Sequence, residues 1–165
     1  MKRSLVLALA GLGLGVGLSF AADPPLMKEG YWSIHTSITS NPGNKKTEST
    51  QTICRNHEYE QYVRNMATKG RTGCKILVDN YSGGTYTVEQ ECTIGGTTLH
   101  SKTVSTSQGD SASHTEAHTT NTPPQYGEAE STTIMDQKYL GACPAGIQPG
   151  DIVRADGRKT NAWKK

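Results

Sequence analysis

The chain has 165 residues, of which 33% are hydrophobic and 19% are charged, and its formal net charge is +2. Lys2 and Arg3 account for this excess, because the remaining 15 basic residues balance 15 acidic ones. The length suits one domain of ordinary size, and a neutral domain without a basic patch excludes nucleic acid as a partner.

The first 21 residues have the pattern of a secretory signal peptide. Lys2 and Arg3 precede an uncharged run over residues 5–18, and small residues flank a cleavage position after Ala21; this is the order of features that defines such signals. The apolar run has 14 residues, fewer than the ~18 that span a bilayer. We therefore expect a mature protein in the periplasm or secreted, with no transmembrane segment after signal cleavage.

Alternating polar and apolar residues, together with 21 threonines, predict strands over most of the remaining chain. Helical spacing occurs once, at Tyr59, Tyr62, Val63 and Met66, after a possible N-cap at Asn56. We predict a mainly β fold, a curved antiparallel sheet of about seven strands that forms a half-barrel or small barrel, with one short α-helix. The expected strands cover residues 31–38, 47–54, 74–78, 86–92, 97–106, 111–120 and 126–140.

The domain organisation follows from where these patterns end. Residues 22–143 are expected to form a single mainly-β domain. Residues 144–165 are rich in glycine, proline and charge, which predicts a loose C-terminal tail.

The four cysteines predict disulfides, because their number is even and an exported chain matures in an oxidising compartment. If a hairpin turns about Gly83, Cys74 lies directly opposite Cys92, within disulfide reach. Cys54 is then left to pair with Cys143. The alternatives are free thiols or a zinc site, but zinc sites favour closely spaced cysteine pairs, and these cysteines are 18 or more residues apart.

Several short motifs carry a resemblance to a known family. They are Gly30-Tyr31-Trp32, Gln51-Thr52-Ile53-Cys54, Cys74, Gly83-Gly84-Thr85, Glu91-Cys92 and Tyr139-Leu140-Gly141-Ala142-Cys143-Pro144. From residue 28 to residue 143 this arrangement resembles the bacterial family catalogued as domain of unknown function 3617. The resemblance implies an exported, mainly β domain of the proteobacterial envelope, and it brings no established activity, cofactor or partner.

Three histidines form a candidate metal site. His114 and His118 lie ~13 Å apart on one strand, too far for a single zinc ion with bonds of about 2 Å. If the hairpin turns about Gly109, however, His100 faces His118, and such a pair can hold a metal. The alternative is a solvated polar face. The other pairs in this register are Lys102 with Glu116 and Val104 with His114.

No catalytic motif is present, so the sequence predicts a protein that is not an enzyme, with no catalytic residues and no cofactor. We expect a monomeric binding module for a small apolar ligand or another envelope component, with ligand-binding residues that the sequence does not identify. A metal-binding stress protein that uses His100, His114 and His118 is the alternative, and a hydrolase whose site is assembled only by the fold is a third. A concave, apolar-lined cavity of several hundred Å³ is the feature that favours ligand binding.

Overall fold

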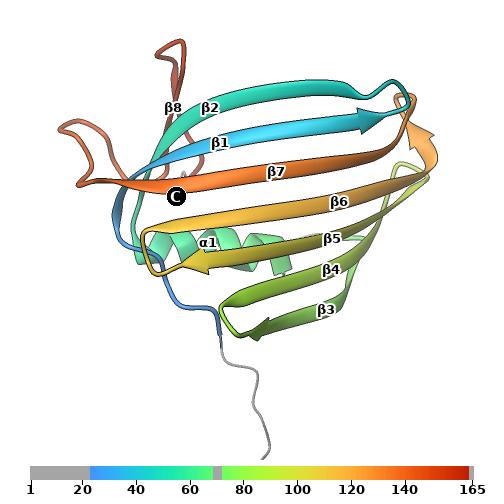
Figure 1. Ribbon diagram of the computed structural model, residues 1–165, viewed down its shortest axis with the longest axis horizontal. Helices are drawn as coiled ribbons and strands as arrows, with labels where there is room; N and C mark the ends of the chain where they lie inside the picture. Colours follow the sequence, from blue (N-terminus) through green and yellow to red (C-terminus); the bar gives the residue numbers. More distant parts are fainter. Residues whose placement is uncertain (1–22, 69–71, 164–165) are drawn as a thin grey trace, which may run out of the picture.

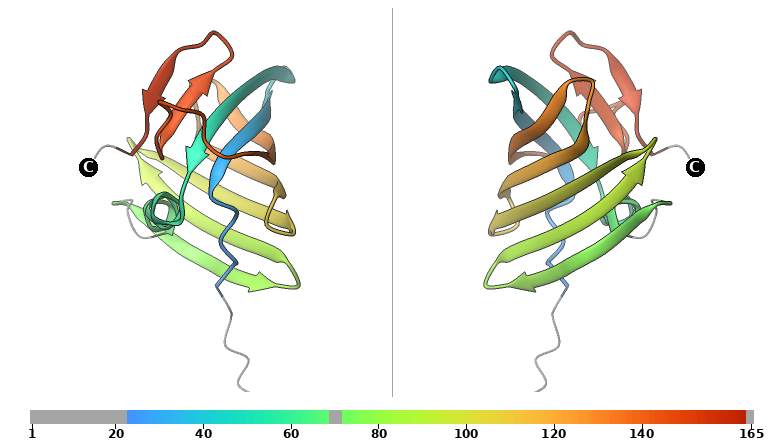
Figure 2. Two further views of the ribbon diagram at one scale, coloured as in Figure 1. Left: turned by 90° about the vertical axis from the view of Figure 1, so that its left-hand side faces the viewer. Right: turned by 90° about the vertical axis from the view of Figure 1, so that its right-hand side faces the viewer.

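The computed structural model describes residues 23–68 and 72–163, so the predicted signal peptide lies outside the described residues. One antiparallel sheet of nine strands dominates it, in the order β3-β4-β5-β6-β7-β1-β2-β8-β9 (Figure 1). The sheet is curved and open (Figure 2). This confirms the fold class, as a half-barrel. The elements are β1 (Gly30–Asn41), β2 (Lys45–Arg55), α1 (His57–Thr68), β3 (Cys74–Ser82), β4 (Thr85–Ile94), β5 (Thr97–Gln108), β6 (Ala112–Gln125), β7 (Glu128–Gly141), β8 (Asp151–Arg154) and β9 (Lys159–Asn161).

Strand β1 joins the two ends of the domain. It pairs with β2 through the first hairpin and with β7, the last long strand. The long strands β3 to β7 each pair with a neighbour in sequence, so the pairing of β1 with β7 joins this run to the β1–β2 hairpin.

The helix α1 follows β2 and lies on the concave side of the sheet (Figure 2). Its start is fixed by Asn56, whose Oδ1 accepts a hydrogen bond from the backbone N–H of Tyr59 at 2.8 Å, so the predicted N-cap is confirmed. Glu58 and Glu60 lie in its first turn, where the helix dipole favours negative charge.

The hydrophobic core is small and lies at one end of the concave face. Its buried members are Trp32, Ile34, Ile53 and Tyr59. The indole N–H of Trp32 donates to the carbonyl of Lys28 at 2.9 Å, which satisfies the one polar atom of this fully buried side chain. The partly buried residues that pack against the core are Met27, Met135, Tyr139, Ile152 and Trp163.

The prediction of a loose tail after residue 143 is wrong, and the strand count is nine where about seven were expected. Strand β8 adds to β2, with Ile152 opposite Ile53, and β9 pairs with β8. Trp163 then packs against Tyr59, with ring centroids 5.8 Å apart. The few apolar residues after residue 143 are dispersed among glycine, proline and charged residues, so they give no periodic signal. Ile152 and Trp163 nevertheless pack against the core, whose buried residues come from earlier segments.

The predicted cysteine pairing is confirmed, with Cys54 bonded to Cys143 and Cys74 to Cys92. The route to the second pair differs from the expected one. The hairpin turns on two residues, Gly83 and Gly84, and a bulge between Ile76 and Val78 then brings Cys74 opposite Cys92. Both glycines have positive φ, as such a turn requires. Of the apolar residues near this disulfide, Val78 and Ile94 are exposed.

The two disulfides close loops of very different length, and their removal is expected to have different effects. The chain-entropy model gives a loss of about 4.6 kcal/mol for Cys54→Ser, since 89 residues separate its partners, and about 3.2 kcal/mol for Cys74→Ser, with 18 residues. Urea unfolding of both variants measures the difference. Peptide mapping of the unreduced protein that recovers a Cys54–Cys74 fragment would contradict the pairing.

The contact between the last described segment and the helix is expected to stabilise the fold. Trp163→Ala removes the ring that packs on Tyr59, and we expect the free energy of unfolding to fall by ~2 kcal/mol, as for a partly buried large-to-small change. Tyr126→Ala is the matched control, because Tyr126 is 98% exposed. Equal stability of the two variants in thermal unfolding would show that residues 144–163 add nothing to the core.

Candidate functional site

A trough runs between α1 and the concave face of the sheet, and its cavity has a volume of about 360 Å³. Strands β1, β2 and β7 form one wall and β4 forms the other, so α1 bridges parts of the sheet that are far apart in strand order. The lining is mainly apolar, and the charged members are Arg55, Glu60 and Arg64. The lining residues are Pro25, Met27, Ile34, Ile53, Arg55, Tyr59, Glu60, Val63, Arg64, Ala67, Tyr86, Val88 and Gln137.

The apolar face of α1 is buried only at its first turn. Tyr59 belongs to the core, but Tyr62, Val63 and Met66 are 39%, 44% and 46% exposed. The sequence predicted these four residues as one packing face, and the structure provides a packing partner for only the first. The sheet carries many serines and threonines on its concave face, and side chains of this size do not reach across to fill the space below the helix.

A buried polar cluster lies at the core end of the trough. The guanidinium of Arg55 lies 5.3 Å from the ring centroid of Trp32, donates to Gln137 Oε1, and has Nη1 3.6 Å from Glu60 Oε1. Glu60 Oε2 also accepts the backbone N–H of Met27 at 3.1 Å. Burial lowers the pKa of Arg55, and the nearby Glu60 carboxylate opposes this effect. The charge of Arg55 is therefore matched by Glu60 inside the trough.

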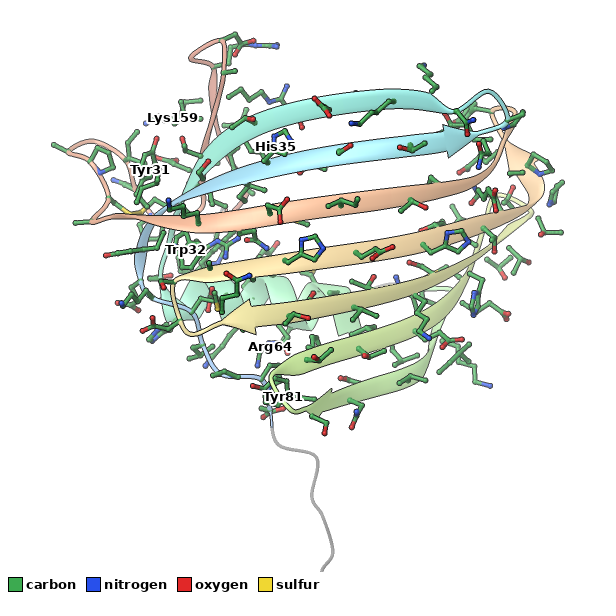
Figure 3. All side chains as sticks on the ribbon, viewed as in Figure 1. Tyr31, Trp32, His35, Arg64, Tyr81 and Lys159 are labelled. Carbon is green, nitrogen blue, oxygen red and sulfur yellow. A yellow bond between two sulfur atoms is a disulfide. The ribbon has the colours of Figure 1, made fainter. Side chains whose placement is uncertain are left out.

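At the other end, the trough opens into a second hollow of about 520 Å³, lined by Asp23, Pro24, Leu26, Gln61, Arg64, Asn65, Asp79 and Tyr86. Arg64 and Tyr86 line both spaces; Arg64 is labelled in Figure 3. Burial, followed by a hydrogen bond with the Asp79 carboxylate, raises the pKa of Tyr86 to about 12. Its hydroxyl thus remains a neutral hydrogen-bond donor at neutral pH.

The predicted histidine cluster does not form. The β5–β6 hairpin turns around Asp110, and His100 lies opposite Thr120 instead of His118. This is a shift of two residues from the predicted register, which alternation cannot detect because the side chains keep their faces. The predicted pairs Lys102–Glu116 and Val104–His114 are wrong for the same reason; Lys102 faces His118, Val104 faces Glu116, and Thr106 faces His114.

Each of these histidines has its own carboxylate neighbour. His100 Nε2 lies 2.9 Å from Glu89 Oε1, His114 Nδ1 2.7 Å from Asp136 Oδ1, and His118 Nε2 4.0 Å from Glu130 Oε2. Within residues 23–68 and 72–163, no group of three or more His, Cys, Asp or Glu side chains is arranged to hold a metal ion. The three histidines therefore lie beside separate carboxylates and do not converge on one point.

Sequence reasoning missed the polar residues of the trough, namely Arg55, Glu60, Arg64, Tyr86 and Gln137. One signal was available, since Glu60 and Arg64 are four residues apart on the predicted helix and so share a face. The approach of Arg55 and Gln137 depends on the pairing of β1 with both β2 and β7, which no local pattern reveals.

A comparison with protein families matches most of the chain. The model of a family described as "Protein of unknown function (DUF3617)" matches residues 27–143. The matched segment contains both cysteine pairs and all of the trough lining except Pro25, and β8 and β9 lie beyond it. No match is found among curated proteins. In the part of the chain that the structure describes, no helix is long and apolar enough to cross a membrane.

The raised pKa of Tyr86 predicts a loss of stability in alkaline solution. The folded protein holds the phenolic proton up to a pKa of about 12, whereas an unfolded tyrosine loses it near pH 10. The stabilisation is complete below about pH 10 and is lost as the pH rises toward 12. Urea unfolding between about pH 9 and pH 11 should show a shallower decline for Tyr86→Phe than for the wild type. Parallel curves would contradict the assignment. Burial also raises the pKa of Tyr59. Tyr59 is present in both proteins, so its titration contributes to both curves.

Proposed function

The chain belongs to the DUF3617 family of proteins of unknown function, and we propose that it is an exported, non-enzymatic protein that binds a small molecule with an apolar part in the trough. The occupant rests on α1 on one side and on the concave face of the sheet on the other. The observation that carries the proposal is the combination of the apolar-lined cavity with the exposed residues of α1.

The volume and lining of the trough suit such a ligand. A cavity of about 360 Å³ lies in the range of small-molecule sites, which are mostly apolar and carry a few polar groups that orient the ligand. Each methylene group that leaves water for an apolar wall contributes ~0.8 kcal/mol. Val63, which is half-exposed, and Ala67 line the side of the trough that such a chain would cover.

Export to the periplasm is part of the proposal. It is supported by the signal-peptide pattern of residues 1–21 and by two cysteine pairs at disulfide distance, which are compatible with an oxidising compartment. Where the ligand is another component of the envelope, an apolar group of that component would bind in the trough. No observation favours the alternative of a metal-binding stress protein, because His100, His114 and His118 each lie beside a different carboxylate.

The test places a charge in the trough. Val63→Asp should abolish binding of the apolar fluorescent probe Nile red, because a carboxylate in the lining cannot be desolvated without a partner. The wild type should bind the probe with an increase in its emission, which a titration measures.

Met66→Asp is the matched control, since Met66 is on the same helix and is 46% exposed, but does not line the cavity. It should bind Nile red as the wild type does, with both variants folded by circular dichroism. Equal loss of binding in the two variants, or no binding by the wild type, would contradict the proposal. Mass spectrometry of the protein purified from the periplasm identifies any lipid that accompanies it.

A further inference from the structure

We infer that the trough selects uncharged ligands that carry a hydrogen-bond acceptor, for example the carbonyl of an ester, and that the side-chain amide of Gln137 donates to this acceptor at the core end of the trough. This inference rests on the proposed function and adds the chemical class of the ligand and the residue that recognises it. The polar groups of the lining differ in whether the protein itself provides their partners.

The charged groups at the core end of the trough balance each other. Arg55 and Glu60 are 15% and 13% exposed, and Arg55 Nη1 lies 3.6 Å from Glu60 Oε1. The second oxygen of Glu60 accepts the backbone N–H of Met27 at 3.1 Å. A carboxylate brought to this place would lie beside Glu60, and an ammonium group would lie beside Arg55, so either would lose its water without gaining an unmatched opposite charge. A ligand group without net charge avoids this cost.

The polar groups nearer the mouth also have partners within the protein. Arg64 Nη2 donates to the backbone carbonyl of Pro24 at 3.2 Å, and the hydroxyl of Tyr86 donates to the Asp79 carboxylate. Arg64 and Asp79 line the same outer hollow, so charges of both signs occur there together. We therefore place recognition of the ligand's polar group at the core end.

Gln137 differs from these residues, because one half of its amide is free to bind a ligand. Its Oε1 accepts a hydrogen bond from Arg55 Nη2. A guanidinium has donors and no acceptor, so the amide must present its oxygen to Arg55. Among the described residues, Gln137 Nε2 has no hydrogen-bond partner. In the same part of the chain the buried side-chain atoms without a partner are Gln90 Oε1 and Asn121 Oδ1, so Gln137 Nε2 faces accessible space.

The amide lies beside the apolar part of the lining. Gln137 of β7 is opposite Ile34 of β1, which belongs to both the core and the trough. Val63 and Val88 line the same cavity, so an apolar chain can lie along them while its polar group faces the amide. Gln137 also lines a hollow of about 470 Å³ beside the β5–β6 turn, but Arg55, which holds its oxygen, lines the trough and not that hollow.

The experiment compares three ligands with the same apolar chain, methyl octanoate, octanoate and octylamine, by isothermal titration calorimetry at neutral pH. The wild type should bind methyl octanoate most tightly. Gln137→Glu keeps an oxygen for Arg55 and replaces the N–H donors by a second acceptor. It should bind methyl octanoate about tenfold more weakly, because one hydrogen bond is lost, and octylamine more tightly than the wild type does. Gln137→Leu should also weaken the binding of methyl octanoate, whereas a purely apolar site would gain affinity from the added leucine.

Gln125→Glu is the matched control, because it makes the same change at the far end of β6, outside the lining. Its affinities should equal those of the wild type, with all variants folded by circular dichroism. An equal loss in Gln125→Glu, an unchanged affinity of Gln137→Glu for methyl octanoate, or tighter binding of octanoate than of methyl octanoate by the wild type would overturn the inference. Binding of Nile red would then leave the proposed function standing.

The place of binding is tested with Val63→Asp, because Val63 lines the trough but not the hollow beside the β5–β6 turn. This variant should not bind methyl octanoate. Binding that persists would place the ligand outside the trough and overturn the inference. Failure of both methyl octanoate and Nile red to bind to the wild type would overturn the inference and the proposed function together.

Discussion

The pairing of β1 with β7 is the interaction on which the rest of the structure depends. It joins the start of the domain to its last long strand over eleven pairs of residues, whereas β3 to β7 pair in chain order, each with the next. This pairing places Trp32 beside Tyr139, with ring centroids 5.7 Å apart, and brings Cys143 within reach of Cys54. Because a long-range pairing costs loop-closure entropy, the disulfide at the same place offsets part of that cost by restricting the unfolded chain.

A second consequence of this pairing is that the core occupies only one end of the concave face. Rows of directly opposed residues cross the sheet, and side chains in one row share a face. The row of Thr36 continues through Met135, Thr115, Ser105 and Tyr86. The middle of such a row has small hydroxyl side chains, and Ser105 and Thr115 bond to each other at 2.9 Å. The two hydroxyl groups thus satisfy each other, and the middle of the row contributes no large apolar side chain to the core.

The helix and the charged residues give that concavity its chemical character. Tyr59 packs against the core and contacts Trp163, which fixes the first turn of the helix. The later apolar residues of the helix are exposed. The buried pair of Arg55 and Glu60 is costly to desolvate and is an inefficient way to stabilise a fold. Its position beside Trp32 and Gln137 gives the trough a polar wall at the end nearest the core.

The local sequence pattern was sufficient for the parts of the structure that local physics controls. Asn56 as an N-cap, the helix that follows it and the glycines at the hairpin turn could be identified because their signals come from neighbouring residues. Alternation was sufficient to predict a curved antiparallel sheet. The pairing of Cys74 with Cys92 was also within reach, because both lie on one hairpin.

Three features could not be predicted from the sequence pattern. The register of β5 with β6 differs by two residues from the expected one, and both registers keep the same residues on each face, so only the turn at Asp110 distinguishes them. The order of strands around β1 gives Ile152 and Trp163 a core to pack against, which turned an expected loose tail into β8 and β9. The trough itself exists because β2, β4 and β7 are brought under one helix. The sequence by itself determined the elements and their polarity, and the tertiary structure decided which charges meet, because charges far apart in the chain approach only once β1 has paired with both β2 and β7.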